Sequence, residues 1–98
     1  MFTVSDKILT ELYRIQRRFC APGSDVPCIS FGQETTGGVV RPPEFFLGAI
    51  KRLPTPGLRP HKLITLGGLE VALIVPDEFD LLEDMHLDVV DGRIVNVL

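Results

Sequence analysis

The stretch GGLEVALIVPDEFDLLEDMHLDVVDGRIVNVL, residues 67–98, decides the fold that we expect for this chain. It opens on Leu69 to Val75, an almost wholly apolar run. Such a run is typical of a central strand that is covered on both faces. Pro76 and the carboxylates after it predict a short acidic helix, because proline suits the first helical position and acids suit the positive end of the helix dipole. The inward stripe of that helix is expected to consist of Phe79, Leu82 and Met85.

The dipeptide Asp91-Gly92 stands between two β-rich runs near the end of the chain. This pair is a strong signal for a two-residue hairpin turn, since both central positions of the turn need a positive φ. A two-residue turn at this place sets Val89 opposite Ile94 and Leu87 opposite Asn96. We therefore predict that the chain ends in a β-hairpin of defined register.

Near the other end, Ser5 precedes an apolar stripe at helical spacing, which consists of Ile8, Leu12, Ile15 and Phe19. A serine before such a stripe predicts a helix N-cap. The breaker Ala21-Pro22-Gly23 should end the helix. Before it, Phe2 to Val4 is either a short strand or a hydrophobic lead-in.

The middle of the chain is rich in strand signals. Extended segments are predicted at 27–32, 39–40, 44–53, 62–66 and 69–75. The segment 44–53 also fits a helix, but we assign it to a strand because Phe45-Phe46 and the internal Gly48 suit a sheet better. Gly67-Gly68 suits a tight hairpin. Pro42-Pro43 must lie at an edge or a bend, because neither residue can donate to a ladder. Together with the helices, these segments predict one α+β domain over residues 1–98, with a mixed or antiparallel sheet, an N-terminal amphipathic helix and a short acidic helix.

Composition narrows the class of protein. The chain has 98 residues, of which 45% are hydrophobic and 23% charged, and a net charge of −3. Residues 1–62 hold nine Lys/Arg against five Asp/Glu, whereas residues 63–98 hold one against eight. This asymmetry can steer a partner or simply be solvated surface. A pI of 5.2 argues against general nucleic-acid binding. Without a signal peptide or an apolar run that could span a bilayer, we expect a cytoplasmic protein that does not enter membranes.

The order of these elements resembles the HesB/IscA-like (A-type carrier) domain of iron–sulfur cluster biosynthesis. The similarity is carried by Leu66 to Pro76, which is similar to the family's V-x-G-V-x-V-x-V-D-P stretch, and by Leu82 to Val90, which is similar to its L-x-x-x-x-I-D-Y-V stretch. Phe2 to Ser5 and the helix after them resemble the family's opening. The resemblance implies the family's compact β assembly and a role beside iron–sulfur metabolism.

The family's cluster ligands are missing from this chain. Its first cysteine lies in a Gly-Gly-Cys loop, and the corresponding loop here has glycines but no cysteine. No Cys-Gly-Cys occurs before Leu98. Thiolates hold iron–sulfur clusters, so the expected domain is degenerate and carries no cofactor. The loop still stands where the resemblance places the ligand site, and it is the candidate residual site, made of Glu34, Thr35, Thr36, Gly37 and Gly38. A plain hairpin or strand-crossing loop is the alternative.

Other reactive residues do not form a recognisable catalytic or metal site. Cys20 and Cys28 are too few for a tetrahedral metal site and are expected to be structural thiols. His61 and His86 lack partners at ligand spacing. The dense carboxylates of 77–84 lack the glycine and spacing of a calcium loop.

Two functions fit these observations. The first is a non-enzymatic HesB/IscA-like domain that acts by protein contact in or beside iron–sulfur cluster assembly. The second is a small structural or assembly module unrelated to that metabolism, such as a phage or complex-building component. Both require a protein partner, and a homodimer stays open.

Overall fold

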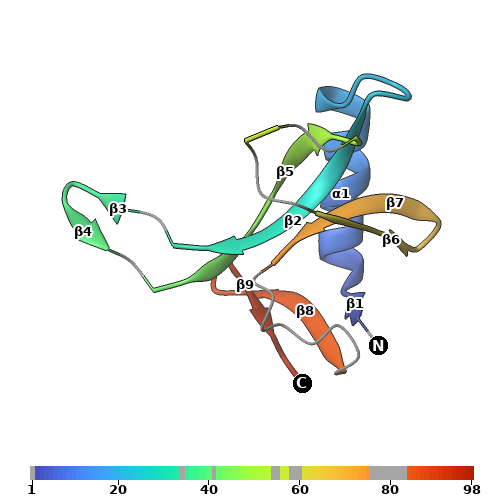
Figure 1. Cartoon of the computed structure of the whole chain (residues 1–98). Helices are drawn as coiled ribbons and strands as arrows, with labels where there is room; N and C mark the ends of the chain where they lie inside the picture. The colour runs from blue at the N-terminus through green and yellow to red at the C-terminus, as the bar shows by residue number, and fades with distance from the viewer. Residues whose placement is uncertain (1, 34, 41, 54–55, 58–60, 76–83) are drawn as a thin grey trace.

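The computed structural model of the chain describes residues 2–33, 35–40, 42–53, 56–57, 61–75 and 84–98. These residues form one helix, a strongly curved seven-stranded sheet and a separate two-stranded hairpin (Figure 1). The elements are β1 Phe2–Val4, α1 Asp6–Phe19, β2 Asp25–Gly32, β3 Thr35–Thr36, β4 Val39–Val40, β5 Glu44–Lys51, β6 Lys62–Leu66, β7 Leu69–Ile74, β8 Met85–Val90 and β9 Arg93–Asn96. The general prediction of an α+β domain with a mixed sheet is confirmed.

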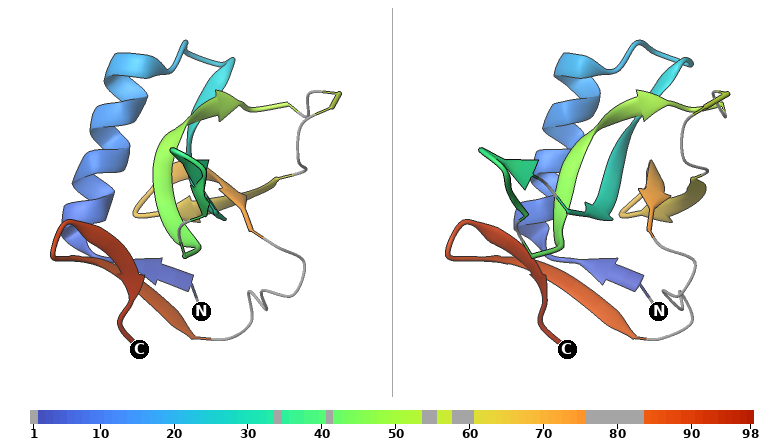
Figure 2. Two further views of the ribbon diagram at one scale, coloured as in Figure 1. Left: turned by 90° about the vertical axis from the view of Figure 1, so that its left-hand side faces the viewer. Right: turned by 60° about the vertical axis from the view of Figure 1, so that its left-hand side comes forward.

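The strand order in the large sheet is β1-β8-β9-β5-β2-β7-β6. Two of its pairings are parallel, β1 with β8 and β2 with β7, and the others are antiparallel. The sheet curves into a nearly barrel-shaped wall, and α1 runs along the β2–β5 hairpin (Figure 2). The terminal β8–β9 hairpin lies beside the N-terminal end of the helix (Figure 2).

The helix forms where the sequence predicts it. The Ser5 side chain accepts a bond from the backbone N–H of Ile8 at 3.4 Å, which satisfies one of the helix's orphan donors. Ile8, Leu12 and Ile15 are buried, and this face of α1 packs against β2, β5 and β8. Phe19 is the exception within the predicted stripe, because 64% of it is exposed at the last turn.

The core lies on both faces of β7. Val71 and Leu73 belong to the main cluster under the helix, together with Ile8, Leu12 and Ile29. Ala72 points to the opposite face, where it packs with Val26 and Cys28. The prediction of a strand covered on both sides is therefore confirmed, although β7 lies one strand in from the edge strand β6.

Both predicted hairpins are confirmed, since β6 pairs antiparallel with β7 across Gly67-Gly68 and β8 pairs antiparallel with β9 across Asp91-Gly92. Val89 pairs with Ile94 and Leu87 with Asn96, as the two-residue turn at Asp91-Gly92 requires. Asp91 and Gly92 have φ values of 52° and 76°. The segment 44–53 is a strand over Glu44–Lys51, which resolves its ambiguity.

One predicted boundary is wrong. Met85 was expected in the acidic helix, but it begins β8 and pairs with Phe2 of the parallel strand β1. The backbone pairing of β1 with β8 extends the strand to Met85. The rest of the predicted helix, residues 76–83, lies outside the described residues. The alternative for Phe2–Val4 is also decided, since these residues form β1.

Candidate functional site

The sheet is interrupted between β5 and β9. β5 pairs with β2 at eight positions from Glu44 to Lys51, but among the described residues it meets β9 at a single pair, Phe45 with Ile94. Continuing that register by two residues would set Pro43 opposite Asn96. Proline has no N–H to donate to a ladder. The Pro42-Pro43 pair therefore ends the β5–β9 ladder on this side, which agrees with the prediction that these prolines lie at an edge or a bend.

Within the part of the chain that the structure describes, the interruption leaves part of the β9 edge without a neighbouring strand. Residues that flank a two-residue hairpin turn form a hydrogen-bonded pair, and bonded pairs then alternate along the ladder. Arg93, Val95 and Val97 accordingly turn their backbone groups toward β8. The bond from the Val97 N–H to the His86 carbonyl, 2.9 Å long, fits this alternation. Asn96 turns its backbone N–H and C=O the other way, toward the missing continuation of β5.

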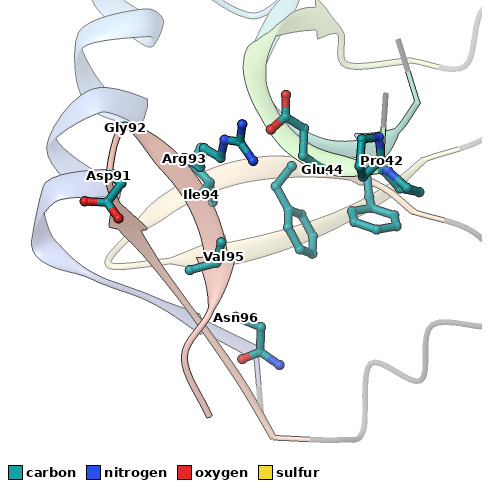
Figure 3. A pocket seen from close by; sticks show the side chains of 11 residues that line it. Pro42, Glu44, Asp91, Gly92, Arg93, Ile94, Val95 and Asn96 are labelled. Carbon is teal, nitrogen blue, oxygen red and sulfur yellow. The ribbon is translucent and has the colours of Figure 1, made fainter. Parts of the chain in front are cut away.

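A groove of about 530 Å³ opens at this interruption (Figure 3). Its floor is apolar and aromatic: the rings of Phe31 and Phe45 lie 4.7 Å apart between centroids and are tilted by 50°. The remaining walls come from the Pro42-Pro43 bend and from β9 with its turn. A smaller hollow of about 300 Å³ adjoins the same Phe45–Ile94 pair and shares Glu44 and Arg93 with the groove.

Opposite charges stand at the mouth of the groove. In Figure 3 the Glu44 and Arg93 side chains extend toward the same side, whereas Asp91, which also lines the groove, extends away from them. Arg93 is exposed and Glu44 is half-buried. Elsewhere in the described part of the chain, Arg14 pairs with Glu11 and Arg52 with Glu70. No such ion pair joins Glu44 to Arg93 within the described residues, so both charges remain available at the mouth.

The loop predicted as a residual site is a free-standing hairpin. Thr35–Thr36 pairs antiparallel with Val39–Val40, and Gly37-Gly38 forms the turn with φ values of 59° and 81°. Glu34 lies outside the described residues. The hairpin, called the arm below, extends away from the sheet (Figure 1). Val39 and Val40 are 65% and 60% exposed. The prediction that this loop forms a hairpin is confirmed, and its role as a residual site stays a prediction.

Neither thiol lines this groove, since Cys28 lies further back in β2 and Cys20 follows α1. Cys28 is buried beside Ala72, and burial raises the pKa of its thiol. Cys20 is partly buried, and its pKa is raised by burial and, to a smaller extent, by the Asp25 carboxylate. Raised pKa values keep thiols protonated and poorly nucleophilic.

The histidines make local structural contacts. The His86 ring nitrogen Nδ1 lies 2.8 Å from the Thr3 hydroxyl, which ties β1 to β8. The His61 ring nitrogen Nε2 lies 2.9 Å from the Arg52 carbonyl. Across the described residues no cluster of three or more His, Cys, Asp or Glu side chains could hold a metal ion. Both histidines therefore hold neighbouring segments together through local contacts.

Comparison of the chain with protein-family models, with curated proteins and with solved structures gives no match. Over the residues described, no helix has both the length and the apolar character to cross a membrane.

Sequence reasoning missed the groove as a site. Its members come from the end of β2, the start of β5 and from β9, segments that are separated along the chain. The available signal in the sequence is Pro42-Pro43. A double proline directly before a predicted strand marks the place where that strand loses a ladder partner.

Proposed function

We propose that this chain is a non-enzymatic protein-interaction module, which works in the cytoplasm. The observation that carries the proposal is the interrupted β5–β9 ladder, where backbone groups of Asn96 face a groove with an aromatic floor. A strand edge of this kind recognises extended polypeptide, because main-chain hydrogen bonds supply affinity and adjacent pockets supply specificity.

The preferred setting is an accessory role in iron–sulfur cluster assembly, as a degenerate HesB/IscA-like domain without ligand cysteines. What supports it is the sequence resemblance of residues 66–92 and the order of strand and hairpin signals. The finer HesB-like arrangement of the sheet and the acidic helix belong to this proposal. The role would be contact with a partner of the assembly machinery, since the thiols that hold a cluster are absent from the loop at 34–38.

The second candidate is a structural or assembly module unrelated to that metabolism. The arm favours this candidate, because it extends away from the large sheet and carries two exposed valines that another chain can contact. Successive strand residues point to opposite faces, so each face of the arm carries one exposed valine that a partner chain can cover.

Site-specific photo-crosslinking in cells tests the shared proposal. A photoreactive phenylalanine analogue at Val95, in the groove wall, should capture a protein. The matched control is the same analogue at Gln16, which is exposed on α1 away from the groove. Capture from Val95 and not from Gln16 supports a protein-binding groove. Equal capture from both positions, or none from Val95, contradicts it.

Anaerobic reconstitution with iron and sulfide separates the two settings. The degenerate-domain proposal expects no stoichiometric cluster. A cluster spectrum that disappears on replacing Cys20 and Cys28 would contradict it. Identification of the protein captured from Val95 as a component of iron–sulfur assembly supports the first setting, and a structural complex component supports the second.

A further inference from the structure

We propose that the face formed by the groove and the arm is an interface between two copies of this chain. The inference deepens the proposed interaction function, and it names the partner as a second copy. The first argument is charge. Glu44 and Arg93 are neighbours of opposite sign at the mouth of one groove (Figure 3).

A two-fold contact requires a self-complementary surface, in which residue i meets residue j and j meets i. A neighbouring carboxylate and guanidinium meet this condition. A two-fold axis passing between them places Arg93 against Glu44 of the partner subunit, and Glu44 against Arg93 of the partner subunit. Both contacts are attractive, so the pair selects its own copy without any other charged partner.

The second argument is the arm. An isolated two-stranded hairpin is at best marginally stable in water. The arm nevertheless forms with Val39 and Val40 exposed, so their apolar surface is uncovered in the single chain. A second copy of the chain would supply a cover for this surface.

The arm and the groove are continuous on the surface. Phe31 and Pro42-Pro43, which line the groove, lie just before and just after the arm in the chain. A two-fold axis near the residues that join the arm to the groove therefore lays each arm across the groove of the other copy. The two equivalent contacts then form together. A strand of the arriving arm also brings the backbone N–H that Pro43 lacks opposite Asn96.

Charge reversal with mixing tests this interface. Arg93→Glu places two carboxylates at each groove mouth, and Glu44→Arg places two guanidiniums there. Each variant alone should self-associate at least about tenfold more weakly than the unchanged chain, since the two contacts of its homodimer turn repulsive. Mixed in equal amounts, the two variants should form a heterodimer with the affinity restored. Sedimentation equilibrium, with one variant carrying a fluorophore, measures each constant.

Two further variants keep the test decisive. The double variant R93E/E44R restores the attractive pair within one chain and should dimerise like the unchanged protein. Arg17→Glu, a reversal on the exposed face of α1, should leave self-association unchanged and controls for net charge. Circular dichroism checks that every variant is folded.

A strictly monomeric unchanged protein up to high micromolar concentration overturns the inference. So does a dimer that ignores both reversals, or two variants that fail to pair on mixing. These outcomes leave the interaction function itself intact if Val95 still captures a different protein, so the two proposals fail separately.

Discussion

At the scale of single residues, Gly67 shows how a turn and the helix depend on one another. Its φ is 54°, and a Cβ atom added there would lie 2.5 Å from Leu9 Cδ2. Its carbonyl accepts a 2.7 Å bond from the Tyr13 hydroxyl of α1. The turn between β6 and β7 is therefore seated directly on the helix.

We expect Gly67→Ala to destabilise the fold by about 2–3 kcal/mol, as the sum of the left-handed backbone cost and the displacement of Leu9. Gly23→Ala is the matched control, because Gly23 has a φ of 76° but nothing within 4 Å of an added Cβ. That variant should lose only the backbone cost, about 1 kcal/mol. Urea denaturation measures the free energy of unfolding of both variants. Equal losses would show that the Leu9 contact contributes nothing.

The thiols give a prediction about pH. Because the pKa values of Cys20 and Cys28 are raised in the folded chain, less thiolate is present at a given pH than in the unfolded chain. Alkylation by iodoacetamide should therefore reach its half-maximal rate at higher pH for the folded protein than for the protein in urea. Near neutral pH, Cys20 should react slowly and Cys28 only after unfolding. Peptide mass spectrometry resolves the two sites, and rapid labelling of folded Cys28 would contradict its burial.

At the scale of elements, the terminal hairpin depends on its turn residues. Asp91 is the only non-glycine residue with positive φ among those described. Asparagine tolerates this conformation, whereas a β-branched side chain does not. We expect Asp91→Val to cost about 1–2 kcal/mol and Asp91→Asn to be nearly neutral. The thermal midpoint by circular dichroism distinguishes them. If Asn and Val lowered it equally, the Asp91 charge and not its backbone would be the cause.

The elements also show what sequence could and could not predict. Asp91-Gly92 and Gly67-Gly68 act locally, so their hairpins and registers follow from adjacent residues. The parallel pairings join segments that are distant in the chain: Phe2 meets Met85, and Cys28 meets Ala72. No local pattern encodes such partners. The Met85 boundary and the groove were missed for this reason, since each depends on which distant strand arrives beside it.

At the scale of the whole molecule, the fold divides into a body and an arm. Every buried hydrophobic residue of the described chain lies in α1, β2, β5, β6, β7 or β8. The arm adds none, so its cost in backbone ordering is not recovered by burial within one chain. This division separates stability from association: the body can keep its core while the arm serves a contact outside it.

That division predicts the effect of removing the arm. β2 and β5 are last paired at Gly32 and Glu44, so an Asn-Gly turn in place of residues 33–43 closes the hairpin in its existing register. The shortened chain should keep its helix and sheet, with a free energy of unfolding within about 1 kcal/mol of the full chain, because every deleted residue whose burial is described is exposed. Urea denaturation of dilute, monomeric protein measures this value.

The same variant bears on self-association. Without the arm and the Pro42-Pro43 bend, the second copy loses both the strand that crosses its groove and one groove wall, so dimerisation measured by light scattering should disappear. A milder control, Val40→Ala, keeps the arm and removes only apolar surface from its exposed side, so it should weaken the dimer without abolishing it. A large loss of monomer stability on shortening would instead make the arm part of the core, which would remove the reason for seeking its cover in another chain.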